Sequence, residues 1–126
     1  MDEPWLDELA EFLRREGYAL YEDQRSPGGA VIRFRGHSCE IHITNDRGDW
    51  WIGLSPLGSD LIMTPQVWAH YIDGTKPVPA TQAEPLDVQI TFVKERLKEA
   101  ELAAARDPDI DRKLIAINRG LLGFDF

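Results

Sequence analysis

Apolar residues recur at helical spacing near the start of the chain. When residues 4–16 are wound as a helix, one stripe is apolar and consists of Trp5, Leu6, Leu9, Phe12 and Leu13. Pro4 suits the first helical position, and Gly17 supplies a stop signal. The opposite stripe is acidic and consists of Glu3, Asp7, Glu8 and Glu11. The sequence therefore predicts an amphipathic helix with a negative outer face.

The pattern then changes to strict alternation, which is typical of half-buried strands. Residues 18–23, 30–35 and 39–44 predict strands, and the aromatic segment from Trp50 predicts another. Turn residues separate these segments, so we expect an antiparallel meander of three or four strands. Whether Leu20 or Tyr21 of the first strand faces inward stays open.

Turn chemistry sets the expected registers of the two hairpins. Gly36-His37 suits a two-residue type II′ turn, and residues 45–48 suit a four-residue loop. Both registers keep one face of the sheet apolar. The expected cross-strand pairs are Phe34–Cys39, Ile32–Ile41, Arg33–Glu40 and Val31–His42 in the first hairpin, and Ile43–Trp50, Ile41–Ile52 and His42–Trp51 in the second.

The second half of the chain has helical patterning. Residues 61–63 predict a last short strand, and Pro65 opens a short helix that Gly74 closes. A surface loop over 75–83 precedes a long helix from Pro85 to about Arg106, and a last helix ends at Gly120. We expect one α+β domain, 1–126: an antiparallel three- to four-stranded meander with an N-terminal helix and C-terminal helices packed on the sheet.

Charge and composition narrow the classes of function. The formal net charge is −8, and residues 1–29 hold eight acids against three arginines. This excess disfavours nucleic-acid partners and anionic membrane surfaces. No apolar run approaches the roughly 20 residues of a membrane helix, and the N-terminus lacks the layout of a signal peptide. A single cysteine suits a reducing compartment, so we expect a cytoplasmic protein.

Few residues form a pattern that indicates catalysis. Cys39 alternates with core positions, which favours a buried structural thiol. The three histidines lack metal-site spacing, and glycine-rich phosphate loops are absent, so we expect neither metal nor cofactor. His42, with Glu40 two residues away on the same strand face, is the one candidate for acid–base chemistry. Sheet faces also carry such residues as simple cross-strand pairs.

The Trp50-Trp51 doublet predicts one ring on each face of the sheet. We expect Trp50 to enter the core and Trp51 to share the far face with Arg33 and His42. Trp and Arg are favoured at binding hot spots, so this face is a candidate interaction surface. In the alternative interpretation a helix covers this face too, and Trp51 belongs to a second core layer.

The segments GYALYEDQ and EIHITNDRGDWWIGLSP, between a leading amphipathic helix and closing helices, resemble small immunity proteins of bacterial polymorphic-toxin systems. The resemblance is one of layout along most of the chain. It implies a compact acidic protein without catalytic residues that binds and neutralises a cognate toxin domain.

These observations favour a protein-binding inhibitor that occludes a basic toxin cleft. The expected partner-binding residues are Asp7, Glu8, Glu11, Arg33, His42 and Trp51. One alternative is an oligomeric adaptor or secretion chaperone that docks through the apolar tail, residues 121–126. Another is a small enzyme that uses His42 and Glu40. The oligomeric state and the identity of the partner stay open.

Overall fold

The computed structural model describes residues 3–80 and 82–124. The order of elements is α1 (Pro4–Arg15), β1 (Ala19–Ser26), β2 (Gly29–Arg35), β3 (Cys39–Asp46), β4 (Asp49–Pro56), α2 (Pro65–Asp73), α3 (Leu86–Arg106) and α4 (Ile110–Leu121). The strands form one antiparallel sheet in the order β1-β2-β3-β4. The predicted α+β meander is therefore confirmed, with four strands.

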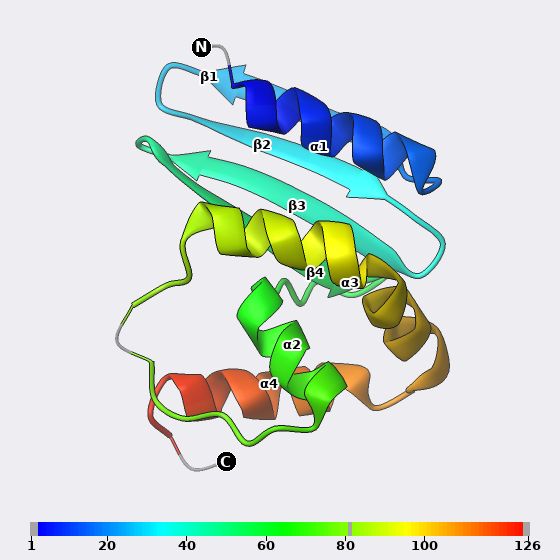
Figure 1. The fold of residues 1–126 in the computed structure, drawn as a ribbon, viewed down its shortest axis with the longest axis vertical. Helices are drawn as coiled ribbons and strands as arrows, with labels where there is room; N and C mark the ends of the chain where they lie inside the picture. The colour runs from blue at the N-terminus through cyan, green and yellow to red at the C-terminus, as the bar shows by residue number, and fades with distance from the viewer. Residues whose placement is uncertain (1–2, 81, 125–126) are drawn as a thin grey trace.

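The helices lie on one face and beyond one edge of this sheet. Figure 1 shows α1 and α3 side by side across the same face, with α2 and α4 beyond β4. Contacts follow this arrangement, since α1 touches β1, α3 touches β3 and β4, and α2 touches both α3 and α4. The opposite face carries no helix among the described residues, so the alternative of a second helical layer over Trp51 is wrong for this part of the chain.

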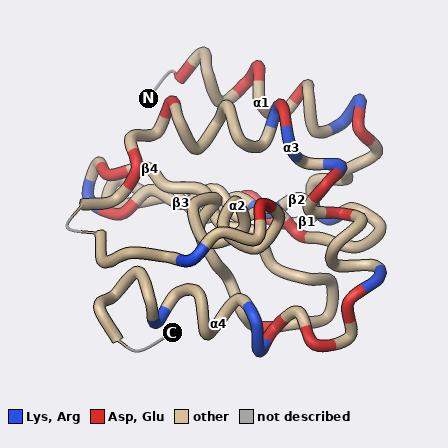
Figure 2. Tube along the Cα trace, turned by 60° about the horizontal axis from the view of Figure 1, so that its bottom comes forward, with Lys and Arg blue, Asp and Glu red and all other residues tan. Residues whose placement is uncertain are grey.

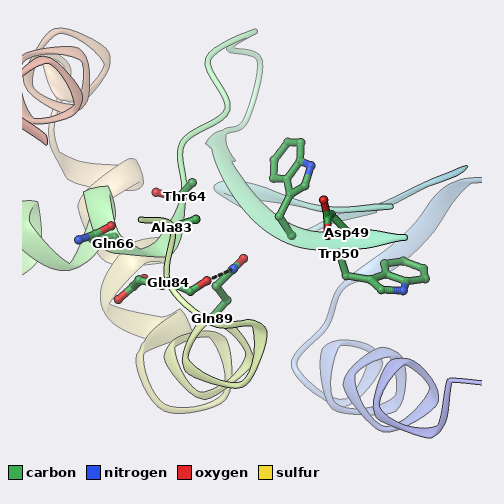
Figure 3. Close-up of a pocket in the computed structure, with 8 residues that line it drawn as sticks. Asp49, Trp50, Thr64, Gln66, Ala83, Glu84 and Gln89 are labelled. Carbon is green, nitrogen blue, oxygen red and sulfur yellow. Dashed lines mark hydrogen bonds between the residues drawn. The ribbon is translucent and has the colours of Figure 1, made fainter. Parts of the chain in front are cut away.

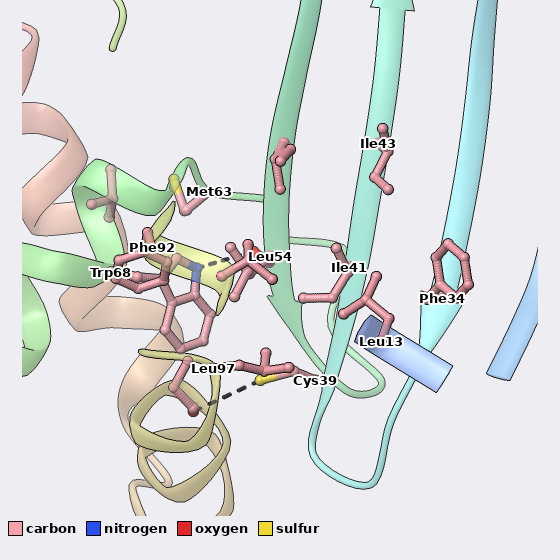
Figure 4. Close-up of a cluster of buried hydrophobic side chains, with 14 of the residues drawn as sticks. Leu13, Phe34, Cys39, Ile41, Ile43, Leu54, Met63, Trp68, Phe92 and Leu97 are labelled. Atoms are coloured by element: carbon pink, nitrogen blue, oxygen red, sulfur yellow. Dashed lines mark hydrogen bonds between the residues drawn. The ribbon is translucent and has the colours of Figure 1, made fainter. Parts of the chain in front are cut away.

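The core fills the space between the sheet and the helices. It includes Ile32 and Phe34 of β2, Ile41 and Ile43 of β3, and Ile52 and Leu54 of β4, all nearly or fully buried. Figure 4 shows Leu54 and Ile41 facing Trp68 of α2 and Leu97 of α3. The Trp68 indole N–H donates to the Leu54 carbonyl over 3.1 Å, so the largest core side chain also has its polar group satisfied.

The first hairpin differs from the expected register. Phe34 pairs with Ile41 and Arg35 with Glu40, so residues 36–39 separate the paired strands and the predicted two-residue turn is wrong. Tertiary contacts set this loop. A Cβ atom at Gly36 would lie 2.5 Å from Tyr18 Cζ and 2.7 Å from Glu101 Oε1. Glycine is therefore needed here for close approach of side chains.

The second hairpin also differs, in the opposite sense. Asp46 pairs with Asp49, so only Arg47 and Gly48 form the loop, in place of the four residues expected. Both have positive φ, 55° and 94°, which is the geometry of a type I′ turn. The Asn45 Oδ1 atom accepts a 2.8 Å bond from the Gly48 N–H and supports this turn.

Both register errors are shifts of two residues, so every side chain keeps its predicted face. The corrected partners across the sheet are Arg33–His42, Val31–Thr44, Ile43–Ile52, His42–Gly53, Thr44–Trp51 and Cys39–Pro56.

Two smaller features complete the sheet. In β1 the register shifts between Leu20 and Glu22, which leaves Tyr21 in a bulge. Leu20 then pairs with Phe34 and lines a groove beside α1, whereas Tyr21 projects to the helix-free face. The predicted short strand at 61–63 is reduced to one antiparallel bridge between Met63 and Leu54.

Candidate functional site

Alternate residues of the four strands project to the helix-free face of the sheet. Residues on it form cross-strand rows, because each pair in the ladder projects to the same side. The rows are Glu22–Arg33–His42–Gly53, Gln24–Val31–Thr44–Trp51 and Arg35–Glu40–Ser55. The structure thus brings the predicted residues Arg33, His42 and Trp51 onto one face, as expected.

Glu40 is the centre of a polar network on this face. Its carboxylate accepts a 2.9 Å bond from the Tyr21 hydroxyl and a 3.0 Å bond from Arg35 Nε. The guanidinium groups of Arg35 and Arg33 lie 4.3 Å and 4.8 Å from the centre of the Tyr21 ring, and Arg33 also pairs with Glu22. These contacts hold both arginines in fixed positions, and the charges in the network balance.

His42 is a buried member of the same network. Its Nε2 atom lies 2.9 Å from Ser55 Oγ and 3.7 Å from Glu40 Oε2, and the residue is only 4% exposed. Burial lowers the pKa of His42, against the opposite effect of the nearby Glu40 carboxylate, so the neutral ring is favoured.

The same contacts bear on acid–base chemistry. A serine–histidine–carboxylate relay needs the serine and the carboxylate on different ring nitrogens, whereas both approach Nε2 here. Ser55 is also fully buried, which separates its hydroxyl from any substrate. The geometry therefore gives no support to catalysis by His42 and Glu40. Cys39 is similarly inaccessible, and burial raises the pKa of its thiol.

The tryptophan doublet divides between the two faces. Trp50 packs edge-to-face on Trp5 of α1, with ring centres 5.1 Å apart. Trp51 lies on the helix-free face near Gly53. A Cβ atom added at Gly53 would lie 3.1 Å from Trp51 Cζ3 and would overlap with Ile62 Cγ2. Trp51 and Ile62 therefore pack over Gly53, and this end of the face is partly apolar.

The acidic residues predicted as contacts lie on a different surface. Asp7, Glu8 and Glu11 are exposed on the outer side of α1. The buried residues of this helix, Leu6, Leu9 and Leu13, pack on the sheet face that lies opposite the helix-free face. Within residues 3–80 and 82–124 these three acids have no ion pair. Figure 2 shows acidic positions recurring along α1. The six predicted residues are thus divided between two surfaces on opposite faces of the sheet.

Two residues with a structural role, Tyr21 and Gln89, were not predicted from the sequence. Tyr21 reaches Glu40 only because of the β1 bulge, which has no clear sequence signal. Gln89 is a buried polar residue of α3 that bonds to the β4 edge. Its spacing, three after Leu86 and four before Val93, places it on the apolar stripe and is a signal that could have identified it.

Comparisons with family models, curated proteins and solved structures gave no significant match to this chain. Among the described residues, no group of three His, Cys, Asp or Glu side chains is placed to hold a metal ion. Within the same residues no helix combines the length and the apolar character needed to cross a bilayer. The local chemistry of the two surfaces is therefore the basis for a functional proposal.

Proposed function

We propose that this chain is a protein-binding inhibitor, an immunity protein that neutralises a toxin by covering the toxin's active site. The observation that carries the proposal is the acidic outer face of α1. Asp7, Glu8 and Glu11 are exposed, and none of them is neutralised by an ion pair among the described residues. Charges left without a partner are available to one that brings complementary charge.

The position of these charges favours a basic cleft as the target. A helix is a convex rod, and α1 lies at the outer side of the molecule above β1 and β2 (Figure 1). A convex acidic helix fits a concave surface lined with Lys and Arg. The net charge of −8 adds a long-range field that accelerates the encounter with such a partner.

The helix-free sheet face contributes less charge but more fixed contact area. Arg33 and Arg35 on this face are already paired with Glu22 and Glu40. They can therefore contact a partner through the flat faces of their guanidinium groups, but they add little net charge. Trp51 and Ile62 supply apolar area next to them. The two surfaces lie on opposite sides of the sheet, so we assign α1 to the toxin cleft and leave the sheet face outside this contact.

The direct test is co-purification with the product of the neighbouring gene, together with relief of that product's toxicity on co-expression. The charge-neutral variant Asp7→Asn/Glu8→Gln/Glu11→Gln should lower the association rate about 10–100-fold at low salt and flatten its salt dependence. The matched control Asp60→Asn/Glu95→Gln/Asp109→Asn removes three exposed acids elsewhere and should retain most of the rate. Absence of binding and of relief would refute the proposal. Equal rates for the two variants would exclude α1 as the contact.

An oligomeric adaptor or secretion chaperone is the second candidate. Leu122 and Phe124 in the described part of the tail are 66% and 57% exposed, although Leu121 is packed in the core. Phe126 lies outside the described residues. Arg119 stacks on the Phe124 ring at 5.0 Å, so part of this apolar surface is covered within the chain. Light scattering separates the candidates, because a strict monomer at all concentrations contradicts docking through the tail.

A further inference from the structure

The outer edge of β4 is closed over most of its length by other parts of the chain. Leu54 exchanges backbone bonds with Met63, at 2.8 and 2.9 Å, and its carbonyl also accepts the Trp68 indole N–H. The Ile52 N–H donates to Gln89 Oε1 over 2.7 Å. These bonds satisfy the Ile52 N–H and both backbone groups of Leu54, where a neighbouring strand would otherwise pair.

Trp50 is where this protection stops. Backbone groups of a strand point to alternate sides, so Trp50 N–H and C=O point outward like those of Ile52 and Leu54. Among the described residues, no hydrogen bond reaches these two groups. The Ile52 carbonyl also points outward without a partner in the described chain. A short length of open strand edge therefore remains at 50–52.

A cavity of about 390 Å³ adjoins this open edge. Figure 3 shows Asp49 and Trp50 on one side of it, and Thr64, Glu84 and Gln89 on the other. This volume lies within the range of roughly 300–1,000 Å³ that is usual for binding pockets. The cavity offers space for a side chain directly beside backbone groups that can pair with an extended segment.

The lining of the cavity favours a cation. Among the described residues that line it are the acids Asp49 and Glu84 together with Trp50 and Trp51, and none of these lining residues is Lys or Arg. Carboxylates form strong charge-assisted hydrogen bonds with guanidinium and ammonium ions. Burial raises the pKa of Glu84, against the smaller opposite effect of the nearby His70.

We propose that this cavity and the open edge at Trp50 bind an extended peptide segment of another protein, which adds a short strand to β4 and inserts a Lys or Arg side chain between Asp49 and Glu84. Alternate side chains of an added strand point to one face, so one basic residue enters the cavity while its neighbours lie along the edge. No residue of α1 lines this cavity, so the proposed peptide site does not depend on the proposal that α1 binds a toxin.

The β1 edge is the competing place for strand addition. It is open along Ala19–Ser26, but it carries the features that block edge pairing, namely the bulge at Tyr21 and the charged residues Glu22, Asp23 and Arg25. The groove between α1 and β1 is lined by Arg14 and Arg25 as well as acids, so its charge is mixed and suits a basic side chain less well. The β4 edge therefore fits a basic segment better.

The experiment titrates the ¹⁵N-labelled full chain with acetyl-Thr-Val-Arg-Val-Thr-amide and follows amide shifts and amide exchange. We expect shifts at Trp50, Trp51 and Gln89 and slower exchange of the Trp50 amide. The same peptide with Gln in place of Arg should bind at least about tenfold more weakly. Glu84→Gln should weaken binding of the Arg peptide by a similar factor. Glu95→Gln, which changes an exposed acid of α3 that does not line the cavity, should leave it unchanged.

Several outcomes would overturn the proposal. Equal affinities for the Arg and Gln peptides would show that the cavity does not recognise a cationic side chain. Shifts along β1 would place strand addition at the other edge. If acetyl-arginine-amide bound as tightly as the peptide, the cavity would be a site for a free cation and strand addition would be wrong. Asp49→Asn gives an independent second variant if Glu84→Gln alters the spectrum of the free protein, and unchanged affinity in it would count against the site.

Discussion

Gln89 joins α3 to the edge of the sheet, and its replacement tests the described geometry most directly. Its Oε1 atom accepts the Ile52 N–H at 2.7 Å, and its Nε2 atom donates to the Glu84 carbonyl at 2.8 Å. The residue is 5% exposed. Methionine has a similar length and no branch, so Gln89→Met preserves the packing of α3 and removes both hydrogen bonds.

The two lost bonds have different costs. Ile52 is fully buried, so its N–H has no access to water in the variant, and an unsatisfied buried donor costs about 1–3 kcal/mol. Glu84 is only partly buried, so its carbonyl can bond to water at small cost. Methionine regains part of the loss through its greater apolar surface. We therefore expect Gln89→Met to lower the free energy of unfolding by about 2 kcal/mol.

Urea denaturation followed by tryptophan fluorescence measures this change through the midpoint at constant m-value. Gln89→Glu should cost less at Ile52, because a carboxylate oxygen still accepts its N–H, but should lose the bond to Glu84. Gln66→Met makes the same substitution in the same cavity at a residue for which no hydrogen bond is found in the described chain, and should stay within about 0.5 kcal/mol of the parent.

Amide exchange provides the second readout. Gln89→Met should accelerate exchange of the Ile52 amide more than that of the Leu54 amide, which stays bonded to Met63. The reasoning is refuted if Gln89→Met is as stable as Gln66→Met, or if the Ile52 amide keeps its protection.

Three further predictions concern the turn and the titrating groups. Arg47 has positive φ, so Arg47→Asn should raise the free energy of unfolding by about 0.5–1 kcal/mol and Arg47→Val should lower it, as thermal unfolding can measure. The depressed pKa of His42 means that its stabilising contribution is present above the unfolded pKa near 6.5 and is lost as pH falls below it; His42→Gln should abolish that part of the pH dependence in urea melts between pH 7 and 5. Lys113 and Tyr71 hold the pKa of Asp107 at about 2, so stability should also fall as pH drops from 4 toward 2, and less in Asp107→Asn.

The faces of the sheet could be predicted because alternation depends only on local sequence. Both hairpin registers were nevertheless wrong by two residues. The first depends on Ser38, whose N–H donates to Glu101 Oε2, and on the Tyr18 ring against Gly36. Glu101 is 63 residues from Ser38, so turn propensity carries no information on this contact. The second depends on Arg47 adopting a left-handed conformation that arginine rarely adopts.

The candidate surfaces were predictable in part for the same reason. Helical periodicity placed Asp7, Glu8 and Glu11 outside, and strand periodicity placed Arg33 and His42 on one face. Burial of His42 did not follow from periodicity, because it depends on what lies over a sheet face. The cavity at Trp50 could not be predicted from the sequence either, because it forms where the segments around Asp49, Thr64 and Glu84 converge in space.

The two surfaces differ mainly in whether their charged side chains already have hydrogen-bond partners, and less in which residues they contain. On the helix-free sheet face, the Glu40 carboxylate already accepts hydrogen bonds from Tyr21 and Arg35. A partner that displaced these hydrogen bonds would have to replace each of them. On α1, Asp7 and Glu11 have no such bonds within the described residues, and binding a basic group there breaks nothing. The net cost of desolvation is therefore lower at α1 than on the sheet face. A polar network that resembles a functional site can thus be the less available surface, while a plain acidic helix is the more available one.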